Sequence, residues 1–155
     1  MDRRFVALAL AAFGLDRIVK ILVMHWLPFQ KPLAIWAPHL YFTYIQNHGA
    51  AFGIFQQQRT LLIGSGLAVL IIFWLLKAEL LQSRLSVFGV AFLVGGDLGN
   101  LFDRIVYNGV IDFIDFRIWP VFNIADICID LGIGLLLLHF WLSRKDTSSG
   151  IAHAS

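Results

Sequence analysis

Apolar residues are grouped into four long runs that are separated by more polar segments. The runs cover residues 5–27, 60–76, 85–102 and 125–142. A helix needs roughly 17 to 25 mostly apolar residues to cross the hydrocarbon core of a bilayer, and each run is long enough. The pattern therefore predicts a mainly α membrane protein, in which four transmembrane helices form a bundle and residues 1–155 make a single domain.

The connections between these runs differ in length. Residues 28–59 and 103–124 form two long links, whereas residues 77–84 form a short turn. The first link contains three prolines and then the run LYFTYI at positions 40–45, whose aromatic and β-branched residues are typical of a strand. The last segment, residues 143–155, is polar, and we expect it to be a disordered tail.

Composition supports a membrane protein and excludes several other classes. Hydrophobic residues make up 59% of the chain and charged residues 14%, whereas soluble domains contain about 25% charged residues. The apolar excess excludes a disordered chain, and scattered basic residues at a net charge of +2 do not make a nucleic-acid-binding surface. Because Cys128 is the only cysteine, no internal disulfide can form. We expect a monomer surrounded by membrane lipid.

Lysine and arginine residues are distributed unequally between the two ends of the predicted helices. The end with the termini and the short turn carries Arg3, Arg4, Lys77, Arg84, Arg144 and Lys145. Because short loops rich in Lys and Arg face the cytoplasm, we expect both termini in the cytoplasm and both long links on the outer side. A cleaved secretory signal at residues 1–20 is the alternative, but charged residues stand at 16, 17 and 20, where cleavage requires small ones.

Aspartates are concentrated in the predicted spans and outer links. They are Asp16, Asp97, Asp103, Asp112, Asp115, Asp126 and Asp130. A charge at the bilayer centre costs at least ~2.5 to 3.5 kcal/mol, so ionisable groups in spans are functional candidates. At a rise of about 1.5 Å per residue, Asp16, Asp103 and Asp126 all fall in the outer part of the membrane. The spacing predicts a polar site just below the outer surface, which a substrate in the lipid can reach from the side.

Several local patterns have structural rather than chemical interpretations. Asp16 and Lys20 are four residues apart, so they share a helix face and form an ion pair. Gly95 and Gly99 have the spacing that lets two membrane helices approach closely. A nucleophilic Ser65 activated by Lys20 is conceivable, but a serine within a helix more often bonds its own backbone. The five histidines show no metal-binding spacing, so we expect no metal and no cofactor.

Aspartate chemistry remains as the interpretation of this site. Two carboxyl groups that are held close together share a proton, so one can activate water while the other donates to a carbonyl oxygen. Hydrolysis of a peptide bond needs both actions. Composition and spacing leave open which two of the seven aspartates form the pair.

Five motifs carry a resemblance to a known family. They are DRIVK (16–20), NHGAAFG (47–53), GGDLGNLFDR (95–104), VIDF (110–113) and FNIAD (122–126). In this order and at these places, the chain resembles the lipoprotein signal peptidases, the type II signal peptidases of bacteria. The resemblance covers nearly the whole chain. It implies an intramembrane aspartic endopeptidase of the bacterial cytoplasmic (inner) membrane, with a small extracytoplasmic β-sheet cradle over its active site.

The resemblance also implies a substrate and a role for each of several residues. The substrates would be diacylglyceryl-modified prolipoproteins, which the enzyme cleaves just before the lipidated cysteine. By motif position Asp112 and Asp126 would be the catalytic pair. The substrate site would be lined by Asn47, Asn100, Arg104 and Asn123, with Asp16, Lys20 and Asp103 as supports. Asp126 stands at the start of a predicted helix, so we expect it to be ionised. Asp112 has apolar neighbours, which favour its protonated form, so we expect it to be the proton donor.

Two acids depart from the pattern of the family. A small apolar residue is expected in place of Asp97, and an apolar or small polar residue in place of Asp130. Helix spacing suggests that the two lie at similar depth below the catalytic pair, where each would be protonated, share a proton with the other or pair with Lys20. Rows of carboxyl groups in a membrane also mark proton relays, so a proton-coupled transporter subunit is the alternative function.

Overall fold

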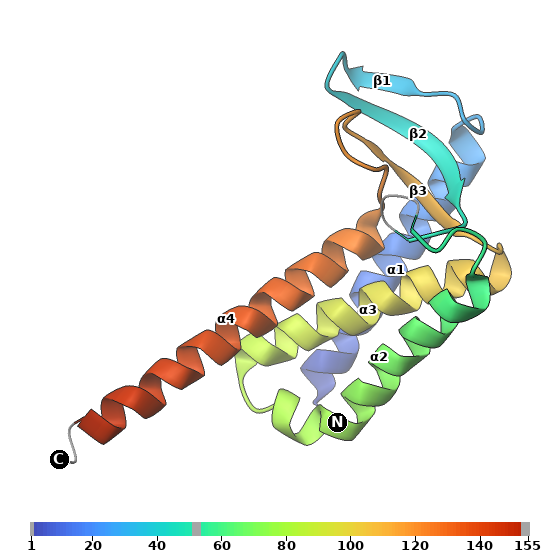
Figure 1. Cartoon of the computed structure of the whole chain (residues 1–155). Coiled ribbons are helices and arrows are strands. Elements are labelled where there is room, and N and C mark those ends of the chain that lie inside the picture. Colours follow the sequence, from blue (N-terminus) through green and yellow to red (C-terminus); the bar gives the residue numbers. More distant parts are fainter. Residues whose placement is uncertain (1, 51–53, 153–155) are drawn as a thin grey trace.

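Four helices and three strands make up the part of the chain that the computed structural model describes, residues 2–50 and 54–152. The helices are α1 (Arg3–Trp26), α2 (Arg59–Leu80), α3 (Arg84–Val106) and α4 (Ile124–Ala152), and the strands are β1 (Leu33–Trp36), β2 (Leu40–Asn47) and β3 (Val110–Asp115). The helices form a bundle, and the sheet covers one end of it (Figure 1). Residues 51–53 of the NHGAAFG motif lie outside the described residues.

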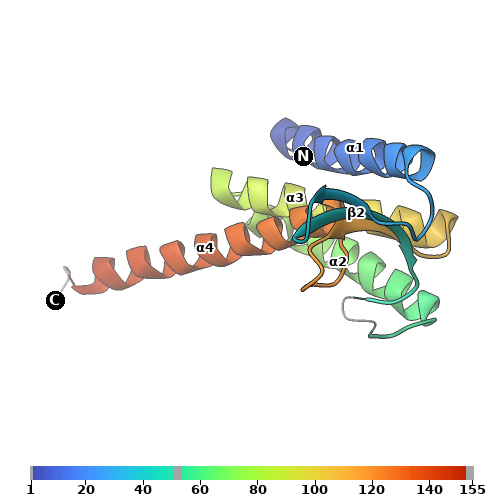
Figure 2. The ribbon, with the colours of Figure 1, turned by 90° about the horizontal axis from the view of Figure 1, so that it is seen from above.

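Helix α3 is the centre of the bundle. It packs against α1, α2 and α4, and Figure 2 shows it between α1 and α2. Two glycines allow α1 to approach it: a Cβ added to Gly95 would lie 2.6 Å from the backbone oxygen of Ala9, and one added to Gly99 would lie 2.6 Å from Oδ2 of Asp16. The prediction that this glycine pair serves helix packing is confirmed.

Three of the helices are long and apolar enough to cross a membrane: Arg59–Leu80, Arg84–Val106 and the Ile124–Arg144 part of α4. These correspond to three of the four predicted spans. Helix α1 has the length, but it carries Asp16, Arg17 and Lys20 in its C-terminal half. All three side chains are buried, so the helix turns these three charges into the protein and not towards the surroundings.

The three strands form an antiparallel sheet in the order β1-β2-β3. The predicted strand at 40–45 is confirmed as the first part of β2. In the register of β2 with β3, Ile45 pairs with Asp112 and Asn47 with Val110. Ile111 and Phe113 of β3 are buried against Val23 of α1, and this apolar contact fixes the sheet on the end of the bundle. Since side chains alternate along a strand, Asp112 faces away from that contact.

The C-terminal segment differs from the expectation. The polar residues from 143 predict a disordered tail, but α4 continues without a break to Ala152. Extending an existing helix adds one backbone hydrogen bond per residue without a new nucleation step, which accounts for the continuation into polar sequence. Residues 153–155 lie outside the described residues.

Candidate active site

The candidate site lies where β3, α3 and α4 meet under the sheet. Strand β3 presents Asp112, and the first turn of α4 presents Asp126. The backbone N–H of Asp126 donates to Oδ1 of Asn123 at 3.0 Å, and the backbone N–H of Asn123 donates to Oδ2 of Asp126 at 3.1 Å. This reciprocal arrangement is a capping box, so the residues that begin the helix also fix the orientation of the Asp126 carboxyl group.

Asparagine amides hold both carboxyl groups. Asp112 accepts from Nδ2 of Asn47 at 2.9 Å and from Nδ2 of Asn123 at 2.6 Å. Asp126 accepts from Nδ2 of Asn100 at 2.7 Å. Asn123 therefore touches both acids, one through its side chain and the other through its backbone. The amides orient the two carboxyl groups without neutralising them.

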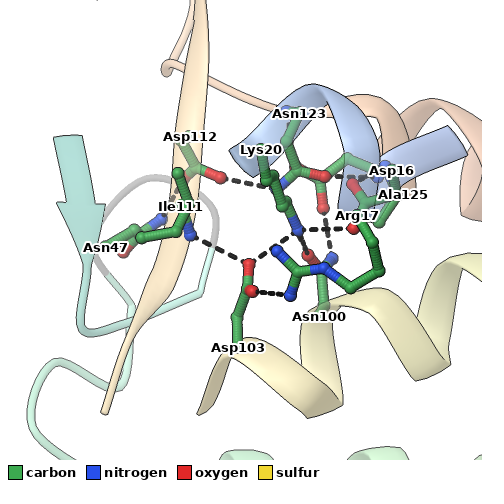
Figure 3. A network of polar contacts seen from close by, with 11 residues as sticks. Asp16, Arg17, Lys20, Asn47, Asn100, Asp103, Ile111, Asp112, Asn123 and Ala125 are labelled. Atoms are coloured by element: carbon green, nitrogen blue, oxygen red, sulfur yellow. Dashed lines mark hydrogen bonds and ion pairs between the residues drawn. The ribbon is translucent and has the colours of Figure 1, made fainter. Parts of the chain in front are cut away.

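A buried ion network lies behind this pair (Figure 3). Nζ of Lys20 lies 3.0 Å from Oδ2 of Asp16 and 2.7 Å from Oδ2 of Asp103, and it donates to Oδ1 of Asn100 at 3.1 Å. Arg17 pairs with the other oxygen of Asp103. The side chains of Asp16, Lys20 and Asp103 are fully buried. The expected pair of Asp16 and Lys20 is thus one part of a four-residue network.

The network also ties the elements of the site together. Oδ1 of Asp16 accepts from the backbone N–H of Ala125 at 3.0 Å, at the start of α4. Oδ2 of Asp103 accepts from the backbone N–H of Ile111 at 3.1 Å, next to Asp112 on β3. The charges of α1 and α3 therefore position the two segments that carry Asp112 and Asp126.

A cavity of about 520 Å³ opens beside the two acids. Its polar wall is formed by Asn47, Asn100, Arg104, Asp112 and Asp126, and its apolar wall by Phe116, Trp119, Pro120, Val121, Phe122, Ile127 and Ile129. Asp130 also lines it. The site can therefore hold a ligand that has both a polar backbone and large apolar groups.

Burial raises the pKa of the Asp112 carboxyl group to about 7. This pKa already includes the negative charge of Asp126, which also raises it, and the hydrogen bonds from Asn47 and Asn123, which lower it. A carboxyl group with this pKa holds a proton at and below neutral pH, so Asp112 is suited to donate one. The raised pKa of Asp112 agrees with the expectation that this residue is the proton donor of the pair.

The structure brings the sequence candidates together in two groups. Asn47, Asn100, Arg104, Asp112 and Asp126 line the cavity, and Asp16, Lys20, Asp103 and Asn123 are buried behind it. Ser65 donates to the backbone oxygen of Leu62 at 2.9 Å, which is the ordinary behaviour of a helical serine. Asp97 turns towards α2, where a Cβ added to Gly66 would lie 3.1 Å from its Oδ1, and it makes no hydrogen bond with Asp130.

Sequence reasoning missed Arg17 and the aromatic wall of the cavity. Arg17 pairs with Asp103 and also lies over the ring of Phe102, 4.6 Å from its centre. An arginine one residue after Asp16, in an otherwise apolar run, was a signal for a buried partner. The wall formed by Trp119 and Pro120 had no comparable signal, because it depends on how the link after β3 folds back.

Taken together, the apolar helices and the buried acids beside a cavity define a membrane-embedded protein with a carboxyl-based site. A family model described as signal peptidase (SPase) II matches residues 8–142. The chain belongs to this family.

Individual relatives support the same assignment. The chain is 40% identical over 142 residues to a lipoprotein signal peptidase of Syntrophomonas wolfei, covering 92% of this chain and 95% of the relative. It is 39% identical over 131 residues to one of Halothermothrix orenii, covering 84% and 90%. A solved bacterial membrane enzyme superposes with a TM-score of 0.81 at 27% identity, covering 94% of this chain and 90% of that structure. The chain is thus a multi-pass membrane protein.

Proposed function

We propose that this chain is an intramembrane aspartic endopeptidase that removes signal peptides from diacylglyceryl-modified prolipoproteins, cutting before the lipidated cysteine. The single observation that carries the proposal is the pair of Asp112 and Asp126, held through Asn123 at the wall of one cavity. The family and its lipoprotein signal peptidase relatives support the substrate class.

The geometry suggests a division of labour in the hydrolysis. Ionised Asp126 takes a proton from a water molecule, whose oxygen then attacks the carbonyl carbon of the scissile bond. Protonated Asp112 donates to the carbonyl oxygen, which becomes part of a tetrahedral intermediate. When the C–N bond breaks, the proton held by Asp126 passes to the leaving amine, and one hydroxyl group of the intermediate returns a proton to Asp112 as the carbonyl group re-forms. Arg104, on the cavity wall, is placed to bind a substrate carbonyl oxygen.

The exposed surfaces support a placement of the chain in the membrane. We propose that α1 is the fourth span, because Asp16, Arg17 and Lys20 are buried while Leu10, Ile18 and Ile21 on its outside are 55–61% exposed. Basic residues near the termini and at the turn after α2 place these ends in the cytoplasm. The active site and the sheet then lie near the outer face of the bacterial cytoplasmic membrane, with the sheet as a cradle over the site. The protein would act as a monomer.

The transporter alternative gains no support. A proton relay requires ionisable groups that continue across the membrane. Here Asp16, Asp103 and Asp126 meet at the sheet end of the bundle.

Cleavage of a defined peptide tests the proposal. The purified protein in detergent, without any ion gradient, should cut a synthetic diacylglyceryl-modified signal peptide once, immediately before the modified cysteine. Mass spectrometry of both fragments identifies the bond. The same peptide without the lipid is the control and should be cut far more slowly. Equal cleavage of both peptides, or a cut at another bond, would contradict the substrate assignment.

A further inference from the structure

A second cavity, the side cavity, adjoins the main cavity beside the two acids. It has a volume of about 340 Å³. Its lining comes from the end of β2 and the residue that follows, from residue 56 and from residues 120–121. Three residues line both cavities: Asn47, Pro120 and Val121. The two cavities therefore share a wall.

The shared wall reaches the proposed catalytic pair. The side-chain amide of Asn47 donates to Oδ2 of Asp112 at 2.9 Å (Figure 3), so the side cavity begins one side chain away from a reacting carboxyl group. A peptide whose scissile bond lies at Asp112 can thus occupy the main cavity on one side of that bond. On the other side of the bond it can continue past Asn47 into the side cavity.

The two cavities differ in the side chains that line them. The main cavity has a wall of large apolar groups, among them Phe116 and Trp119. The described lining of the side cavity contains no Asp, Glu, Lys or Arg, and its polar members are three amides and an imidazole, those of Gln46, Asn47, Gln56 and His48. Amide and imidazole groups form hydrogen bonds with an uncharged peptide backbone.

The segment between α3 and β3 holds two of these polar side chains in place. Nε2 of Gln46 donates to the backbone oxygen of Tyr107, and Nδ1 of His48 lies 2.9 Å from the backbone oxygen of Asn108. Because a backbone oxygen only accepts, Nδ1 carries the hydrogen, and the other ring nitrogen of a neutral imidazole is left as an acceptor. Oε1 of Gln46 is a second acceptor. Gln56 is hydrogen-bonded to none of the described residues, so its amide can both donate and accept.

We propose that the side cavity binds the peptide backbone of the residues that directly follow the lipidated cysteine. This inference rests on the proposed function, which supplies the substrate. A signal peptide has an apolar core, and the diacylglyceryl group is apolar too, so both match the main cavity and the surrounding lipid. The chain after the cysteine begins the exported protein, which is exposed to water. It is the part of the substrate that matches a polar cavity.

Peptides of two lengths test this assignment. Both carry the same signal peptide and the lipidated cysteine; one ends there with an amide, and the other continues with three alanines. For the unmodified enzyme we expect kcat/KM to be about tenfold higher for the longer peptide, the size of one to two net hydrogen bonds. A longer peptide with N-methylated alanines lacks the backbone N–H donors and should lose most of this gain.

Two substitutions of Gln56 locate the gain in the side cavity. Gln56→Trp places a large ring there and should reduce the ratio of kcat/KM for the long and short peptides to about one. Gln56→Ala removes only the amide and should leave a ratio of about three. Comparing the two peptides within one variant cancels any change in its overall activity. Gln58→Ala is the matched control and should keep the full ratio, because Gln58 lines neither cavity and its side chain forms no helix cap.

The possible results separate this inference from the proposed function. A longer peptide without advantage in the unmodified enzyme, or an advantage that survives in Gln56→Trp, would overturn the inference while leaving the peptidase assignment intact. An advantage that N-methylation leaves unchanged would also overturn it. If the melting temperature shows that Gln56→Trp does not fold, the fall of the ratio in Gln56→Ala decides. Failure to cleave either lipidated peptide would instead overturn the proposed function.

Discussion

The ion network and the proposed catalytic pair lie side by side, but they hold their acids in different ways. In the network, Asp16 and Asp103 are paired with Lys20 and Arg17. In the pair, Asp112 and Asp126 are held by neutral amides and backbone N–H groups. No lysine or arginine among the described residues forms a salt bridge with either member.

This difference separates two tasks. A carboxylate that is paired with a cation is fixed in position by the ion pair, so it is suited to hold α1, α3, β3 and α4 in place. A carboxyl group held by amides keeps its orientation and can still gain or lose a proton, as the raised pKa of Asp112 indicates. Changes in the network should therefore act on stability, and changes around the pair should act on turnover.

The largest effect is expected from Lys20→Met. Methionine fills the space of the side chain but leaves Asp16 and Asp103 without their shared cation, and breaking a buried ion pair costs about 3 to 5 kcal/mol. Thermal unfolding in detergent should show the loss. Lys77→Met is the matched control, because Lys77 lies over the ring of Trp74 and outside the network. Equal melting temperatures for Lys20→Met and the unmodified protein would show that the network does not hold the fold.

A smaller effect, on turnover alone, is expected from Asn123→Ser. Serine keeps a cap for α4 but removes the amide that donates to Asp112 at 2.6 Å. Loss of a positioned donor in an active site lowers kcat by about 100-fold, while the melting temperature should stay close to that of the unmodified protein. Asn123→Ala should lose the same activity and, in addition, about 1 kcal/mol of stability. Full activity in both variants would refute a role of this amide in catalysis.

The pH dependence of kcat should show the smallest effect. With its pKa raised to about 7, Asp112 is protonated below that pH and ionised above it. Because the mechanism needs the protonated form, kcat should fall by about tenfold for each pH unit above neutrality. The measurement uses saturating lipidated peptide between about pH 5 and 9, the range over which such a group titrates. A kcat that rises through this range would assign the donor role to another group.

Local features of the sequence predicted most of the fold. The apolar runs marked the helices, and the aromatic run from residue 40 marked β2, because both depend on composition within a few residues. Strand β3 was not predicted. It is short, and its partner strand β2 is far away along the chain. The pair of Arg17 and Asp103, 86 residues apart, was missed for the same reason.

The candidate site followed mainly from the family resemblance. Spacing along the chain placed the acids near the outer surface, but it did not distinguish Asp112 from Asp115, which lie on the same short strand. Their environments separate them: Asp115 accepts from Thr43 within the sheet, whereas Asp112 lines the cavity. The predicted sharing of a proton between Asp97 and Asp130 is wrong. The position of a residue along a helix axis does not determine which side of the helix its side chain faces.

The central claim is that Asp112 and Asp126 carry out the chemistry while the network holds the fold. Measuring cleavage of the lipidated peptide together with the melting temperature, for Asp112→Asn, Asp126→Asn and the control Asp115→Asn, tests it directly. We expect no detectable cleavage in the first two variants, because an amide cannot exchange the catalytic proton, and most of the activity in the third. All three should melt near the temperature of the unmodified protein. Turnover at a rate near that of the unmodified enzyme in Asp112→Asn or Asp126→Asn would contradict the account.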